Sequence, residues 1–366
     1  MSLRAAFSCA APSLTALLLA CSSTGDPAAG NNASAGTGGS SMTTPTAGAG
    51  GTGAAGSAGG STAGPGGSAT AGSATGGSAT GGGGNGTSAG TGGQDTSGAV
   101  DAARPSAGCS KPAAIEPGRF DAATIGGRPT WLHLPATYDP ERAYPLIFVW
   151  KGCSALGLTS YGLENVVGED AIVVQGDFPP GAQCYDTADN STFPDLPFFD
   201  SLLTHVQDNY CVDSAHVFSV GFSSGAWLTQ LLACQRGDVL RGIGTIAGAF
   251  KPAFLNGAAA CKGSGLSAFM VSDLADHTNP FYDEDKDGDS VEVAVNHWLN
   301  ANGCTDKTWS MTAGTPAAPD EAVCRSYAGC GRFPVELCLT DGKGHAAQET
   351  LSMPGFWQMF QQSLPK

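Results

Sequence analysis

The apolar residues between positions 129 and 339 form short continuous runs, and the segments between several of them have helical periodicity. Runs such as IFVW and IVVQ are typical of strands that are covered on both faces. The predicted strands are residues 129–134, 145–150, 171–175, 217–222, 242–247, 267–271 and 335–339. The predicted helices are residues 197–210, 224–235, 291–301 and 355–364. This alternation predicts an α/β fold with an open, mainly parallel sheet and helices on both faces.

The N-terminal part of the chain has a different pattern. Residues 22–107 are almost entirely Gly, Ala, Ser and Thr, so they cannot bury enough apolar surface to fold. We expect a disordered linker with an r.m.s. span of about 50 Å, followed by one folded domain, residues 108–366.

Residues 1–21 have the features of a targeting segment. A short basic start precedes the apolar stretch SLTALLLA, which is too short to span a bilayer. The stretch ends in Leu-Leu-Ala-Cys, which resembles the lipobox of bacterial lipoproteins. The resemblance implies lipidation of Cys21 and a location at the outer membrane or cell surface. An ordinary secretion signal is the alternative, and both interpretations predict export.

Export agrees with the cysteines, because ten of the twelve lie in the predicted domain and an even number suits an oxidising compartment. We expect Cys211 to pair with Cys234, since both should lie at the amino edge of the sheet. Cys153 and Cys184 are expected to pair at the opposite edge. The sequence contains no C-x-x-C pair and no Cys/His cluster with zinc spacing, so we expect no metal site.

Charge limits the possible partners. A net charge of −15 argues against nucleic acid and against electrostatic docking on anionic lipid, so any membrane contact should be through the lipid anchor alone. We expect a monomer.

The segment DEDKDGD, residues 283–289, resembles the start of a calcium loop, but Ala294 stands where an EF-hand has its bidentate Glu. A solvated acidic turn is the favoured interpretation.

The pattern G-x-S-x-G occurs twice, around Ser88 and around Ser223. Ser88 lies in the linker, with no strand before it and no helix after it. Ser223 lies between a predicted strand and a predicted helix, where a sharp turn would lift its hydroxyl above the sheet at the positive end of the helix. The pattern therefore predicts a nucleophile at Ser223, and a helix-capping serine is the alternative.

A serine nucleophile needs a base and an acid that orients the base. Among the six histidines, we choose His345, because it follows the last predicted strand on a glycine-flanked loop. Asp273 and Asp276 both follow the strand at 267–271, at the sheet edge where α/β folds build their sites. The order Ser, Asp, His is that of α/β-hydrolases.

Five segments carry a resemblance to a known family: YPLIFVWKGC, VFSVGFSSGAWLTQLLAC, MVSDLADHTNPF, the predicted helix that ends in NGC, and PVELCLTDGKGH. They resemble the secreted esterases that include feruloyl esterases, acetylxylan esterases and polyhydroxybutyrate depolymerases. The resemblance implies an α/β-hydrolase fold and ester hydrolysis through an acyl-serine without a cofactor. It assigns Ser223 as nucleophile, His345 as base and Asp276, in preference to Asp273, as acid.

The chain departs from that family around the site. Lys151-Gly152-Cys153 stands in place of His-Gly-Cys, and Tyr185 in place of a Trp. Both changes border the expected pocket, so Lys151 and Tyr185 are predicted to contact substrate. Lys151 could add positive charge near the oxyanion or point to solvent. Strand-turn-helix geometry predicts the N–H of Ser224 as one oxyanion donor, and the resemblance points to Cys153 for the second.

We therefore predict a serine esterase that binds and hydrolyses an ester substrate. The favoured substrates are feruloyl or acetyl esters of plant polysaccharides. A polyhydroxybutyrate depolymerase is the first alternative. A non-catalytic surface module that binds a polymer is the second.

Overall fold

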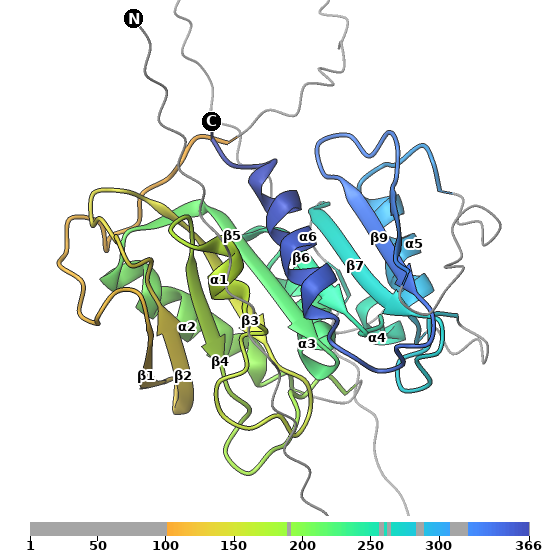
Figure 1. The fold of residues 1–366 in the computed structure, drawn as a ribbon, viewed down its shortest axis with the longest axis horizontal. Helices are drawn as coiled ribbons and strands as arrows, with labels where there is room; N and C mark the ends of the chain where they lie inside the picture. Colours follow the sequence, from red (N-terminus) through yellow and green to blue (C-terminus); the bar gives the residue numbers. More distant parts are fainter. Residues whose placement is uncertain are drawn as a thin grey trace, which may run out of the picture. The chain divides into compact units, whose positions relative to one another are not determined.

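A nine-stranded sheet forms the centre of the fold (Figure 1). The computed structural model describes residues 101–188, 192–255, 260–261, 265–282, 289–307 and 321–365. The strand order is β1-β2-β4-β3-β5-β6-β7-β9-β8. The six strands from β4 to β9 in this order pair in parallel, whereas β1, β2 and β8 pair antiparallel with their neighbours. The strands are β1 Phe120–Ile125, β2 Arg128–His133, β3 Tyr144–Trp150, β4 Ile172–Gly176, β5 Val212–Phe222, β6 Leu240–Ile246, β7 Ser267–Asp273, β8 Val323–Ser326 and β9 Val335–Thr340.

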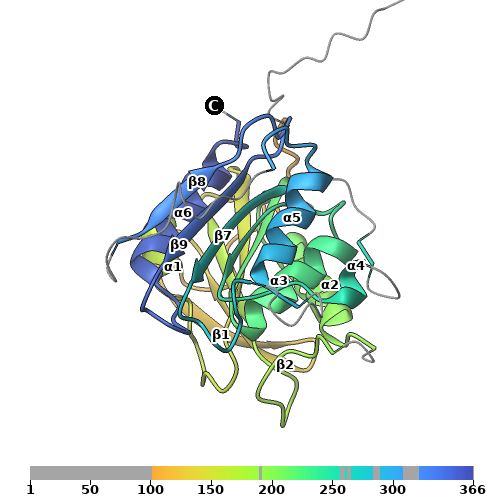
Figure 2. The same ribbon diagram turned by 90° about the vertical axis from the view of Figure 1, so that its right-hand side faces the viewer.

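Helices cover both faces of this sheet (Figure 2). One face carries α1 and α6, and the other carries α2, α3, α4 and α5. The helices are α1 Leu163–Val167, α2 Asp195–Asn209, α3 Ser224–Gln235, α4 Pro252–Leu255, α5 Val291–Ala301 and α6 Glu349–Gln361. This arrangement is the predicted α/β-hydrolase fold, with a mainly parallel sheet between two helical layers.

The central strand β3 shows why its sequence is a continuous apolar run. Leu146, Phe148 and Trp150 pack into the core cluster on the side of α2 and α3. Ile147 and Val149 pack into the other cluster, on the side of α1 and α6. Successive side chains of a strand point to opposite faces, so two covered faces require an apolar residue at every position.

The predicted elements are confirmed, with differences at their ends. The helices at 224–235 and 291–301 have the predicted bounds. Helix α6 begins six residues before the predicted start at Gly355 and contains Pro354. Proline disfavours a helix interior, and Pro354 stands directly before the predicted start. The buried contacts of Ser352 and Met353 extend the helix past it nonetheless. Strands β1 and β8 were not predicted.

The folded part begins earlier than the expected boundary at residue 108. The N–H of Arg104 donates to Asp213 Oδ1 at 2.8 Å, and Ser106 Oγ donates to the carbonyl of Tyr210 at 2.8 Å. Asp101 forms ion pairs with Arg241 and Arg332. Composition missed this segment because polar and backbone contacts hold it, and not apolar burial. Residues 1–100, which include Ser88 and Cys21, lie outside the described residues, as do residues 283–288 of the candidate calcium loop.

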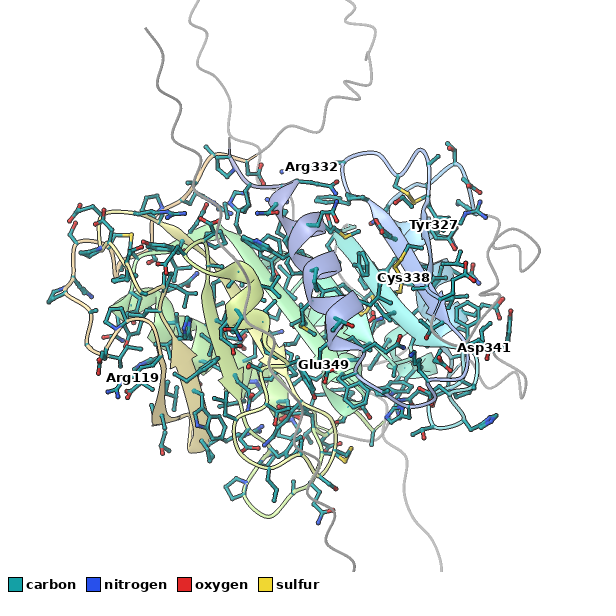
Figure 3. The ribbon with its side chains drawn as sticks, in the orientation of Figure 1. Arg119, Tyr327, Arg332, Cys338, Asp341 and Glu349 are labelled. Atoms are coloured by element: carbon teal, nitrogen blue, oxygen red, sulfur yellow. A yellow bond between two sulfur atoms is a disulfide. The ribbon has the colours of Figure 1, made fainter. Side chains whose placement is uncertain are left out.

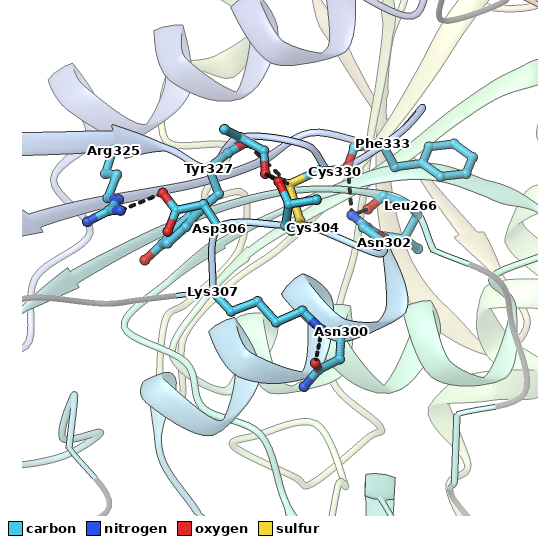
Figure 4. Close-up of a disulfide and its surroundings, with 12 residues drawn as sticks. Leu266, Asn300, Asn302, Cys304, Asp306, Lys307, Arg325, Tyr327, Cys330 and Phe333 are labelled. Atoms are coloured by element: carbon cyan, nitrogen blue, oxygen red, sulfur yellow. Dashed lines mark hydrogen bonds and ion pairs between the residues drawn. A yellow bond between two sulfur atoms is a disulfide. The ribbon is translucent and has the colours of Figure 1, made fainter. Parts of the chain in front are cut away.

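Five disulfides join the ten cysteines of the domain. The predicted pair Cys153–Cys184 is confirmed. The predicted pair Cys211–Cys234 is wrong, because each cysteine has a nearer partner from a segment without predicted structure: Cys211 bonds Cys109, and Cys234 bonds Cys261. The remaining bonds are Cys304–Cys330, shown in Figure 4, and Cys324–Cys338. Within the described residues, no helix combines the length and apolar character that a bilayer span requires.

Candidate active site

Ser223 occupies the sharp turn between β5 and α3. Its φ of 53° lies in the left-handed region, which is strained for a residue with a side chain. Its backbone N–H donates to the carbonyl of Ile246 at 3.0 Å, which ties the turn to the end of β6. Ser223 is the N-cap of α3, but its side chain makes no capping hydrogen bond. The hydroxyl is therefore free of the capping role that was the alternative interpretation.

The two glycines of the G-x-S-x-G pattern allow this turn to form. A Cβ on Gly221 would lie 2.2 Å from the carbonyl oxygen of Gly225. A Cβ on Gly225 would lie 2.1 Å from the carbonyl oxygen of Trp150, at the end of β3. Both distances are too short for any side chain, so the close passage of strand, turn and helix requires glycine at both positions.

The structure brings Ser223, His345 and Asp276 together. His345 Nε2 lies 2.9 Å from Ser223 Oγ, and His345 Nδ1 lies 2.8 Å from Asp276 Oδ2. The other carboxylate oxygen, Asp276 Oδ1, accepts the backbone N–H groups of Thr278 and Asn279. The acid is thereby fixed on one side by its own loop and on the other by the imidazole. These distances are those of a nucleophile, a base and an orienting acid.

Asp273 has a different place, which sequence spacing could not distinguish from that of Asp276. Its carboxylate accepts hydrogen bonds from the hydroxyl of Thr340 and the N–H groups of Ala275, Lys343 and Gly344. Burial alone would raise the pKa of Asp273, but these four hydrogen bonds hold it below its ordinary value. Asp273 thus anchors the loop that carries His345 and does not contact the imidazole in the described structure.

The aromatic ring of Phe222 also packs against the imidazole of His345. The centroid of Phe222 lies 5.0 Å from that of His345, with the rings inclined at 35°.

Among the other histidines, His277 is exposed and His216 is fully buried. His216 bonds Asp213 at 2.6 Å and the carbonyl of Ser363 at 2.8 Å, at the opposite edge of the sheet.

The site lies at the carboxyl edge of the parallel strands. Figure 3 shows Asp341, directly after β9, and Glu349, at the start of α6, at this edge, whereas Arg332 lies at the opposite edge. Ser224 is the first residue of α3, where backbone N–H groups have no partner within the helix. Cys153 follows β3 on the loop that passes Ser223: a Cβ on Gly152 would lie 3.3 Å from that of Ser223. The predicted donor Ser224 therefore follows the serine directly, and the loop that carries the predicted donor Cys153 passes the serine at Gly152.

Lys151 and Tyr185 take positions that the sequence did not predict. Lys151 is 1% exposed, and its Nζ pairs with Asp177 Oδ1 at 2.7 Å, so it points neither to solvent nor to the serine. Tyr185 is 4% exposed and donates to the carbonyl of Gly176 at 2.7 Å. Both side chains are almost fully buried, Lys151 is one of the residues that line a cavity, and their contact with substrate stays a prediction. A cavity of about 350 Å³ lies beside Lys151, lined mostly by residues 154–157 and 177–183.

The described residues contain two groups of three side chains whose potential metal-ligand atoms lie close together. One is Cys234, Cys261 and His297, and the other is Cys324, Glu336 and Cys338. Both pairs of cysteines form disulfides, so neither group offers thiolates.

Sequence reasoning missed two residues that shape the site. Asn279 bonds the carbonyl of Ala247 at 2.6 Å and accepts the indole N–H of Trp227 at 3.2 Å, which joins the Asp276 loop to β6 and α3. Tyr161 accepts the backbone N–H of Gly152 at 3.0 Å. Neither residue belongs to a motif with a spacing that could have identified it.

Comparison with known proteins adds the family context. A feruloyl esterase C of Emericella nidulans is 27% identical over 272 residues, which cover 70% of this chain and 90% of that protein. A feruloyl esterase D of Neurospora crassa is 32% identical over 168 residues. The chain is similar in sequence to feruloyl esterases. The match to feruloyl esterase D covers only 56% of that relative's length and 41% of this chain. No protein-family model matches.

Solved structures of esterases are more distant than these feruloyl esterases. An acetyl xylan esterase from Aspergillus awamori aligns with a TM-score of 0.48 at 14% identity, covering 67% of this chain and 99% of that one. A ferulic acid esterase from Anaeromyces mucronatus aligns with a TM-score of 0.40 at 13% identity, covering 72% and 97%. The fold assignment rests on the strand order and the two helical layers, and not on these similarities.

Proposed function

We propose that the protein is a serine esterase that hydrolyses carboxylic esters through an acyl-enzyme on Ser223. The observation that carries the proposal is the continuous chain of hydrogen bonds from Asp276 through His345 to Ser223 at the end of a strained strand-helix turn. The similarity to feruloyl esterases over most of the folded domain supports it.

In the proposed reaction, His345 Nε2 takes the proton of Ser223 Oγ as the oxygen attacks the ester carbonyl. Asp276 holds the imidazole in the tautomer that leaves Nε2 free to accept that proton. The developing oxyanion receives hydrogen bonds from the N–H groups of Ser224 and Cys153. His345 then protonates the leaving alcohol. In the second half of the reaction, His345 takes a proton from a water molecule as that water attacks the acyl-serine. It then returns a proton to Ser223 Oγ as the acid leaves. None of these steps requires a cofactor.

We propose feruloyl or acetyl esters of plant polysaccharides as the substrate class, because the sequence relatives are named for feruloyl ester hydrolysis. The test is a hydrolysis panel of methyl ferulate, acetylated xylan fragments and hydroxybutyrate trimers. We expect a higher kcat/KM for one of the first two, and Ser223→Ala should abolish it while Ser88→Ala, in the second G-x-S-x-G pattern, leaves it unchanged. A preference for the trimers would replace this substrate class with polyesters. Full activity of Ser223→Ala would refute the nucleophile.

Five disulfides in the domain fit an exported protein. We further propose that Cys21 is lipidated and that the N-terminal segment tethers the domain to a membrane. Mass spectrometry of the N-terminal peptide of the exported protein tests this, and a free serine or alanine N-terminus from a different cleavage would contradict it.

A further inference from the structure

We propose that Tyr161 is a positioning residue that holds the oxyanion loop, residues 151–153, in its active geometry. The inference rests on the proposed esterase function and adds a residue to its machinery. Tyr161 lies between β3 and α1, two residues before the helix begins at Leu163. Its phenolic oxygen accepts the N–H of Gly152, the residue immediately before the Cys153 donor.

Gly152 is the point at which this loop needs to be held. Glycine is required there, because a Cβ would lie 2.8 Å from the ring of Phe222. A glycine also rotates freely about its backbone bonds, so nothing intrinsic to it fixes the direction of the next N–H group. The orientation of the Cys153 N–H must therefore come from attachments on both sides of Gly152.

The structure provides such attachments. On the amino side, Tyr161 fixes the N–H of Gly152, and the carbonyl of Lys151 accepts the hydroxyl of Ser224 at 3.3 Å. On the carboxyl side, Cys153 is bonded to Cys184, and the N–H of Ser154 donates to the carbonyl of Gln183 at 2.7 Å. Gly152 itself accepts the N–H of Ala155 at its carbonyl, at 3.4 Å, and donates its own N–H to the side chain of Tyr161.

Two observations indicate that Tyr161 is held in place for this contact. Its φ of 57° is in the left-handed region, which is rare for a bulky residue and persists only where the surroundings enforce it. Its ring packs edge-on against Phe222, with centroids 6.0 Å apart, and Phe222 in turn packs on His345. Burial raises the pKa of Tyr161 to about 12, so the phenol stays neutral at the pH of catalysis.

The test is Tyr161→Phe, which removes the hydroxyl and keeps the ring. Tyr138→Phe is the matched control, because the Tyr138 hydroxyl also accepts a backbone N–H, that of Cys211 at 2.7 Å, at the opposite edge of the sheet. For Tyr161→Phe we expect kcat to fall about 10- to 100-fold with KM little changed, because small misplacement of an oxyanion donor is costly. Tyr138→Phe should keep wild-type kcat.

A trifluoromethyl ketone matched to the acyl group separates positioning from a general structural effect. It forms a tetrahedral adduct whose oxyanion occupies the same donors, so its Ki should rise by the same factor by which kcat/KM falls. Wild-type kcat in Tyr161→Phe, or a lower kcat with an unchanged Ki, would overturn the proposal. If the wild-type protein hydrolyses no ester, the proposed function fails. If the wild type is active and Tyr161→Phe has no effect on its activity, only this inference is refuted.

Discussion

The Cys153–Cys184 disulfide should contribute to both stability and catalysis, and removing it separates the two. Its cysteines are 31 residues apart. The chain-entropy relation gives a loss of about 3.7 kcal/mol in the free energy of unfolding when both are changed to alanine. The change also releases the Cys153 N–H from one of its attachments, so we expect kcat to fall about 10-fold or more.

Cys304–Cys330 provides the control for this experiment (Figure 4). Its separation of 26 residues predicts a loss of about 3.5 kcal/mol by the same relation. Both of its cysteines are buried, whereas Cys153 is exposed, so the control also leaves small cavities and should be at least as destabilised. It contacts no residue of the candidate site, and kcat at 25 °C should stay at the wild-type value.

The assays are urea unfolding for stability and kcat for methyl ferulate at 25 °C, where both variants are folded. The expected result is similar destabilisation of the two double variants with loss of kcat only in Cys153→Ala/Cys184→Ala. Equal kcat in the two variants would refute the view that the disulfide orients the oxyanion loop.

Four further substitutions test other contacts. Asp273→Asn should lower the Tm, because it weakens four hydrogen bonds to a carboxylate. The pKa of Asp273 is lower in the folded state than in the unfolded state. The Tm difference from wild type should therefore be largest above about pH 5 and should shrink as the pH falls through the folded-state pKa. Asp276→Asn should reduce kcat far more than Asp273→Asn, and the reverse order would exchange their roles. Lys151→Met should cost about 2 to 4 kcal/mol by leaving Asp177 without its buried cation, and Lys151→Met/Asp177→Asn should recover part of that loss in urea unfolding. Gly225→Ala should cost about 2 kcal/mol or more and lower kcat strongly, because its Cβ would collide with the carbonyl of Trp150, and wild-type Tm and kcat would contradict this packing.

The sequence predicted those parts of the fold that apolar patterning controls. The buried strands β3, β4 and β5 and the helix α3 follow from runs and periodicity, and the position of Ser223 follows from their junction. Residue order then brings His345 and the Asp273–Asp276 pair to the same sheet edge. Spacing leaves both aspartates open and the family resemblance favours Asp276, and it is Asp276 that bonds the imidazole.

The parts that the sequence did not predict depend on individual polar or covalent contacts. Lys151 is a predicted substrate contact because it replaces a family histidine, and the sequence did not show that its long side chain also reaches Asp177. Cys211 and Cys234 looked like partners because they flank the same strand-helix unit. Cys109 and Cys261, which take their places, come from segments with no periodicity to locate them.

The most direct test of the central claim is active-site labelling with a fluorophosphonate, followed by peptide mapping. Such a reagent bonds only to a serine whose proton is removed by a neighbouring base. We predict one equivalent of label on Ser223, none on Ser88, and at least a hundredfold slower labelling in His345→Ala. Label on another residue, or undiminished labelling of Ser223 in His345→Ala, would contradict the account.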